Sequence, residues 1–92
     1  MKRSLKPEKL FDELEEIAGR LFAEVRHEQG YFQTGVCKLQ GKTILMINKR
    51  QPLDERIAAL AQAIERAGAE TLYIKPAVRA EIERYTSSRI NV

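Results

Sequence analysis

Three stretches of the chain carry hydrophobic residues at the spacing of an amphipathic helix. The first begins at Pro7, the second runs from Pro52 to a stop at Gly68, and the third runs from Pro76 to Tyr85. Proline fits the first position of a helix, and glycine suits the position that ends one. In the first stretch acidic residues fill the faces left by the apolar positions, which are Leu10, Leu14, Ile17, Ala18 and Leu21. This 3.6-residue period predicts three helices.

Shorter periods between the first two helices predict strands at residues 23–28, 35–40 and 43–48, with a tight connection at Gly41-Lys42. Residues 71–74 are β-prone and could add a fourth strand. The order α-β-β-β-α-(β)-α predicts an α+β fold, in which helices pack against a three- or four-stranded, mainly antiparallel sheet.

The segment Thr43–Asn48 is apolar on both faces, whereas a strand with one covered face would alternate. We therefore expect this strand either to be central, with both faces packed, or to meet another subunit. In the second case Ile44 and Met46 would form the interface of a homodimer.

The length of 92 residues suits one domain, so we expect a flexible N-terminus over residues 1–6 and a single domain over 7–92. The chain has 16 basic and 13 acidic residues, a mixed surface that permits a nucleic-acid partner without requiring one. Its single cysteine excludes an internal disulfide. Its longest apolar run, Ile44–Ile47, is far short of the ~20 residues that span a bilayer. No signal-like segment begins the chain, and we expect a cytoplasmic protein without membrane contact.

His27 and Cys37 are the only soft metal ligands, on strands expected to be neighbours in a hairpin. A structural zinc site needs about four ligands, and a thiolate–imidazole pair needs an orienting group that is not evident here. We expect Cys37 to pack as a small hydrophobic residue and His27 to be partly exposed. No catalytic residue, metal site or cofactor is therefore predicted.

Cations between the second strand and the second helix make the best candidate for anion binding. The segment from residue 38 to residue 50 contains no acid, and its last residues precede a positive helix end. An ordinary loop, in which Asn48 bonds its own backbone, explains the same residues. The order α-β-β-β-α also matches double-stranded RNA-binding domains, but Asp54 and Glu55 open the second helix where phosphate would lie. Nucleic acid is possible but not favoured. The candidate ligand-binding residues are Lys38, Lys42, Asn48, Lys49 and Arg50.

From Gly35 to Arg66 the chain resembles the strand–strand–helix portion of the ImmA/IrrE-like zinc metallopeptidases. The resemblance rests on Ile47-Asn48, Pro52, Glu55-Arg56 and the helical run Leu60-Ala61-Gln62-Ala63-Ile64-Glu65-Arg66. In that family a His-Glu-x-x-His core holds zinc and activates water. Here Gln62 and Arg66 replace the histidines and Ala63 replaces the glutamate, so the resemblance implies a related scaffold without the metal site.

The whole chain is also similar to a small bacterial family of unassigned function. The shared features are Gly-Val-Cys-Lys-Leu, Ile-Asn-Lys-Arg and Tyr-Ile-Lys-Pro-Ala-Val-Arg. Together these observations predict a non-catalytic binding or interaction module, with a second copy or another protein as its partner. The alternative is a binder of RNA or an anionic ligand through the basic residues.

Overall fold

The computed structural model describes residues 5–87 and contains three α-helices and three strands in those residues. The α+β fold predicted from the sequence is confirmed. The elements in chain order are α1 (Pro7–Leu21), β1 (Glu24–Glu28), β2 (Gly35–Leu39), β3 (Lys42–Asn48), α2 (Leu53–Arg66), the 3-10 turn η1 (Ala69–Thr71) and α3 (Pro76–Ser87).

Proline and glycine set the helix ends, as the sequence predicts. Pro7 is the first residue of α1, Pro52 directly precedes α2, and Pro76 begins α3. Gly68 lies two residues beyond α2 with a φ of 95°, a left-handed conformation that glycine adopts without a side-chain clash. The third helix runs two residues past the predicted end at Tyr85.

The sheet has the order β1-β3-β2 and is mixed rather than mainly antiparallel. β1 pairs with β3 in parallel, with Glu24 opposite Ile44, and β2 pairs with β3 antiparallel, with Val36 opposite Leu45. This strand order has a physical reason. β3 is the most apolar strand, and in the central position it has a neighbouring strand along each of its two edges. The more polar β1 and β2 take the edges, so these two strands are not neighbours.

Two loop segments complete the local description. The hairpin from β2 to β3 turns through Gln40 (φ 52°) and Gly41 (φ 81°), the positive pair that a type I′ turn requires. The optional fourth strand over residues 71–74 does not form. Instead η1 is followed by a short extended segment in which Ile74 is buried in the core.

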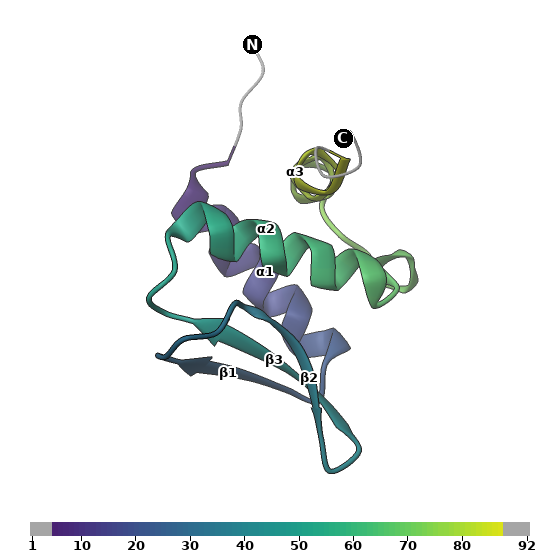
Figure 1. Cartoon of the computed structure of the whole chain (residues 1–92). Helices are drawn as coiled ribbons and strands as arrows, with labels where there is room; N and C mark the ends of the chain where they lie inside the picture. The colour runs from purple at the N-terminus through teal and green to yellow at the C-terminus, as the bar shows by residue number, and fades with distance from the viewer. Residues whose placement is uncertain (1–4, 88–92) are drawn as a thin grey trace.

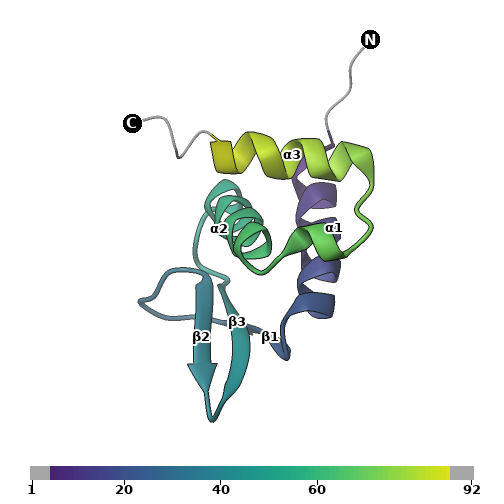
Figure 2. The same cartoon turned by 90° about the vertical axis from the view of Figure 1, so that its right-hand side faces the viewer.

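The helices all lie on one side of the sheet (Figure 1). α2 lies between the sheet and α3, and α1 runs behind α2 (Figures 1 and 2). Leu45 and Ile47 on β3 are fully buried and belong to the core that the helices complete. The same core includes Leu14 from α1 and Leu60 from α2.

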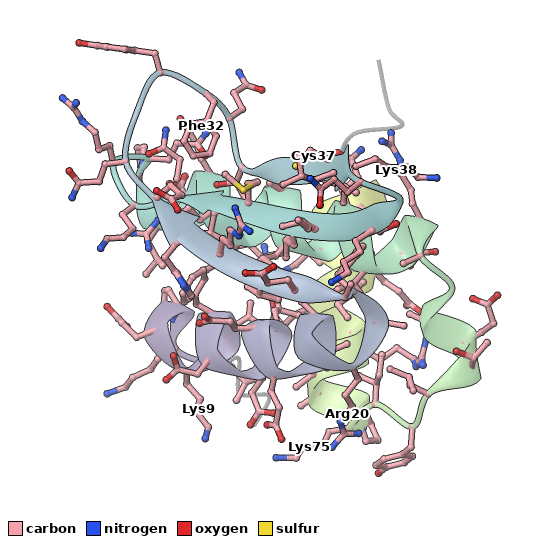
Figure 3. All side chains as sticks on the ribbon, turned by 90° about the horizontal axis from the view of Figure 1, so that it is seen from below. Lys9, Arg20, Phe32, Cys37, Lys38 and Lys75 are labelled. Atoms are coloured by element: carbon pink, nitrogen blue, oxygen red, sulfur yellow. The ribbon has the colours of Figure 1, made fainter. Side chains whose placement is uncertain are left out.

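The opposite face of the sheet has no helix of the described chain in front of it (Figure 3). Ile44 is nevertheless only 2% exposed, with Glu24 and Cys37 beside it in the strand register. Arg26 on the same face donates a hydrogen bond to Glu24 at 2.8 Å and lowers the pKa of that carboxyl. β3 is therefore central, which is the first of the two expected alternatives, and Ile44 on its second face is buried within the single chain.

The N-terminus predicted to be flexible covers residues 1–6, of which the structure describes residues 5 and 6. Residues 1–4 lie outside the described residues, as do residues 88–92 at the other end. Leu5, inside the predicted flexible segment, packs against the core.

Candidate functional site

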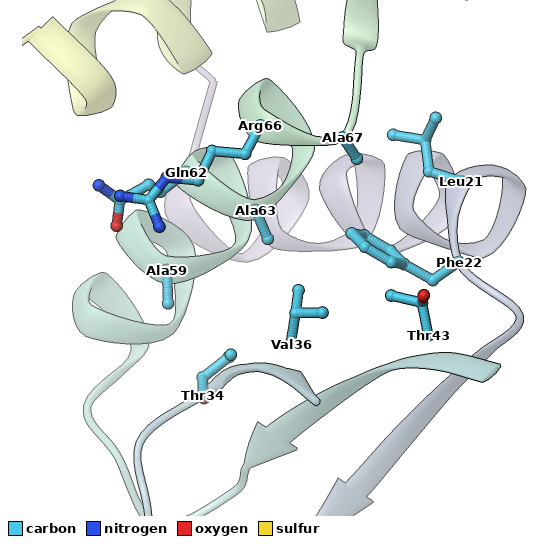
Figure 4. Close-up of a pocket in the computed structure, with 11 residues that line it drawn as sticks. Leu21, Phe22, Thr34, Val36, Thr43, Ala59, Gln62, Ala63, Arg66 and Ala67 are labelled. Carbon is cyan, nitrogen blue, oxygen red and sulfur yellow. The ribbon is translucent and has the colours of Figure 1, made fainter. Parts of the chain in front are cut away.

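A groove separates β2 from the C-terminal half of α2 (Figure 4). It encloses about 600 Å³. From β2 it is lined by Thr34, just before the strand, and by Val36, and from α2 by Ala59, Gln62 and Arg66. A second hollow of about 400 Å³ shares Thr34, Ala59 and Gln62 with the first and extends the lining to Glu55. We call the two together the α2–β2 groove.

The helical wall of the groove is made from small residues. Ala59, Ala63 and Ala67 recur every four positions, so they lie on one face of α2. Their methyl groups fill little of the space between helix and strand. Gln62 and Arg66 lie beside them, one turn of helix apart, and line the same groove (Figure 4).

The strand wall has an open backbone edge. In the described chain β2 pairs with β3 alone, so backbone N–H and C=O groups on its outer side have no strand partner. Val36 is 47% exposed and points into the groove (Figure 4). The edge of β1 is different, because α1 lies along it and His27 Nε2 is 2.5 Å from Glu15 Oε2. At the β2 edge an open backbone therefore lies beside a groove.

The dimensions of the two walls match. The twelve residues from Glu55 to Arg66 make about 18 Å of helix at 1.5 Å per residue. A five-residue strand spans about 17 Å at 3.4 Å per residue. β2 has five residues, so an extended segment of the same length could lie along the whole groove.

Asn48 holds the loop that leads into β2. Its Nδ2 group donates hydrogen bonds to the carbonyl oxygens of Gly30 (3.0 Å) and Phe32 (2.5 Å). Its Oδ1 atom accepts from the Arg50 backbone N–H at 3.0 Å, and its own N–H donates to Thr34 Oγ1 at 2.9 Å. Asn48 is 4% exposed. A residue proposed from sequence as a ligand-binding group is thus a buried clamp that positions the start of the edge strand.

A second set of contacts fixes the same loop to α2. The Thr34 backbone N–H donates to Gln51 Oε1 at 2.8 Å, and the Gln51 carbonyl oxygen accepts from Arg56 Nε at 3.0 Å. The Arg56 guanidinium also lies 5.2 Å from the centre of the Phe11 ring. These contacts link the strand wall and the helical wall at one end of the groove.

The other predicted ligand-binding residues are not brought together. Lys38 and Lys42 flank the hairpin at one end of β3, while Lys49 and Arg50 follow its other end. The seven residues of β3 separate the two pairs by about 20 Å. Arg50 lies over the Tyr31 ring at 5.7 Å. The described structure therefore presents two separate pairs of cations and no single basic surface that includes all four.

Two predictions for His27 and Cys37 are wrong, namely that their strands are neighbours and that Cys37 packs in the core. β3 lies between their strands, and the register places His27 opposite Ile47 and Cys37 opposite Ile44, on opposite faces of the sheet. Cys37 is exposed rather than packed in the core, because it faces the side of the sheet that the helices leave open. Within residues 5–87 no three His, Cys, Asp or Glu side chains are grouped so that they could hold a metal ion.

The groove contains the three positions that the sequence singled out by resemblance, Gln62, Ala63 and Arg66. Sequence reasoning missed Val36 and Ala59 as parts of the same site. The repeat of alanine every fourth residue on α2 could have indicated a thin helical face, but nothing in the sequence identified β2 as the strand beside it.

No family model, curated protein or solved structure matches this chain. None of the helices described here has the length and the apolar character needed to cross a membrane.

Proposed function

We propose that this protein is a non-catalytic interaction module that binds an extended segment of a partner polypeptide. The segment adds to the sheet at the open edge of β2 and places alternate side chains in the α2–β2 groove. The observation that carries the proposal is the unpaired edge strand beside a groove of equal length. Strand addition of this kind draws affinity from main-chain hydrogen bonds and specificity from side-chain pockets.

Binding is favoured over catalysis by the chemistry of the larger hollow. Its lining residues include no carboxylate, imidazole or thiol. General acid–base catalysis needs such a group within hydrogen-bond reach of the reacting atoms. The pattern agrees with the resemblance of Gly35–Arg66 to a peptidase scaffold whose zinc ligands are replaced.

The other partners predicted from sequence have less support. A homodimer through Ile44 and Met46 would rest on side chains that are 2% exposed and half-buried in the single chain. A nucleic acid bound through the basic residues would have to reach cations at both ends of β3. A partner bound in the α2–β2 groove would need neither buried side chains nor cations at both ends of β3, because the two walls of the groove lie next to each other.

A random peptide library displayed on phage tests the proposal when it is panned against the protein and against Ala59→Trp. We expect the wild-type protein to enrich peptides, and the Trp side chain to abolish their binding by filling the groove. Ala77→Trp is the matched control, since Ala77 is exposed on α3, away from the groove. The thermal unfolding midpoints of both variants establish that they are folded. Peptides that bind Ala59→Trp as tightly as the wild type would refute the groove as the binding site.

A further inference from the structure

The two ends of the α2–β2 groove differ in charge. At one end the only acid among its lining residues is Glu55. At the other end the charged lining residue is Arg66. Lys38 lies two residues beyond Val36 on the same face of β2, opposite Thr43, which also lines the groove. Arg66 therefore gives this end positive charge, and Lys38, which is not itself a lining residue, lies on the strand opposite a lining residue.

The side chains of Arg66 and Lys38 are not neutralised within the described structure. Both residues are exposed, and none of the ion pairs among residues 5–87 includes either of them. Other cations of the chain do have acidic partners, such as Arg26 with Glu24 and Arg84 with Glu81. A cation at the rim of a groove without an acid nearby is suited to an anionic group on the bound partner.

An apolar socket adjoins this positive end. Phe22, which is 8% exposed, and Ala63 form its inner side, and Val36 forms its outer side (Figure 4). Ala63 lies three residues before Arg66, so the two side chains leave α2 about one turn of helix apart. In an extended segment, side chains on the same face are two residues and about 6.8 Å apart.

We propose that the bound segment is a strand of another protein with an apolar side chain in this socket. A side-chain carboxylate two residues away lies against Arg66. This inference rests on the proposed function and adds the chemistry of the partner to it.

The same charges argue against a second copy of this chain as the partner. Two β2 strands paired antiparallel about Cys37 would place Val36 of each beside Lys38 of the other. The two Lys38 side chains would then lie near the symmetry axis, whereas Glu55, the acid of the groove lining, belongs to the other end of each groove. Like charges at such a distance oppose pairing, whereas an acidic foreign segment is attracted.

Peptide selection against Arg66→Glu tests this chemistry. From the wild-type protein we expect peptides with Asp or Glu two positions from an apolar residue. From Arg66→Glu we expect the acid to be replaced by Lys or Arg at that position. Lys49→Glu is the control, because it reverses an exposed cation outside the groove. Circular dichroism establishes that all three proteins are folded.

A selected peptide with its ends capped then gives the size of the effect. Changing its acid to the corresponding amide should weaken binding by about threefold to tenfold at low salt, as expected for a charge-assisted contact near the surface. The difference should shrink in 0.5 M salt because the ions screen the pair.

The outcomes separate the two proposals. Groove-binding peptides without an acid preference, or an unchanged preference in Arg66→Glu, would overturn this inference and leave the proposed function standing. Acid preference that changes in Lys49→Glu instead would also overturn it. If the wild-type protein selects no peptide that Ala59→Trp fails to bind, the proposed function is wrong and this inference falls with it.

Discussion

At the scale of single residues, Asn48 joins the loop before the edge strand to the end of β3. Its side chain joins three backbone groups from two loops, and its backbone N–H reaches a fourth partner on Thr34. A lone turn would need only the bond between Oδ1 and the Arg50 N–H. The two bonds donated by Nδ2 are what draw the loop before β2 toward the end of β3.

Substitution of Asn48 should therefore distinguish a clamp from a simple turn. Asn48→Ala leaves the carbonyl oxygens of Gly30 and Phe32 without their donor, and we expect a loss of about 2–3 kcal/mol in unfolding free energy. Asn48→Asp keeps the turn acceptor but opposes those carbonyl oxygens with another acceptor, so it should cost at least as much. Urea denaturation measures both. An Asp variant within about 0.5 kcal/mol of the wild type would show that the turn bond alone matters.

At the scale of elements, an ion pair joins α1 to the segment before α3. Lys75 Nζ donates to Glu13 Oε2 at 3.1 Å, and Lys9 lies 3.5 Å from the same carboxylate. The hydrogen bond from Lys75 holds the pKa of Glu13 below its ordinary value of 4.5. The pair therefore stabilises the fold above the unfolded-state pKa, and this contribution is lost as the pH falls through the lowered pKa of the folded state.

Glu13→Gln should accordingly lower stability at neutral pH and leave it unchanged in acid. We expect a loss of about 0.2–1 kcal/mol at pH 7 that shrinks and disappears as the pH falls below 4.5 and through the lowered pKa of Glu13. Unfolding free energies from urea titrations across this range measure it. Asp12→Asn, at an exposed position of the same helix, is the control. A difference that persists undiminished in acid would contradict an ionic origin.

The elements also show how far sequence reasoning reaches. The helices follow from local signals that act within a few residues, such as Pro7, Pro52 and Gly68. The burial of Leu45 and Ile47 follows equally from the doubly apolar pattern of β3. The parallel pairing of β1 with β3 does not, because it depends on which strand the sheet places in its centre. Because β1 and β2 were expected to be neighbours, the sequence could not predict that Cys37 is exposed or that β3 separates it from His27.

At the scale of the whole molecule, the groove results from two asymmetries of the fold. The helices cover one face of the sheet, and its two edges differ, since α1 lies along β1 while β2 has no element of the described chain along its outer edge (Figure 3). The sequence predicted Gln62, Ala63 and Arg66 as notable positions through a resemblance. It could not predict their place beside β2, because a groove is formed by residues from separate elements.

The most direct test of strand addition at β2 is nuclear magnetic resonance of the ¹⁵N-labelled protein with a selected peptide bound. The account predicts cross-strand contacts between the peptide backbone and β2, slowed hydrogen exchange at alternate amides from residue 35 to residue 39, and shift changes at Ala59 and Arg66. Contacts and shifts confined to Lys49 and Arg50, or to the face of the sheet that carries Ile44 and Met46, would contradict it.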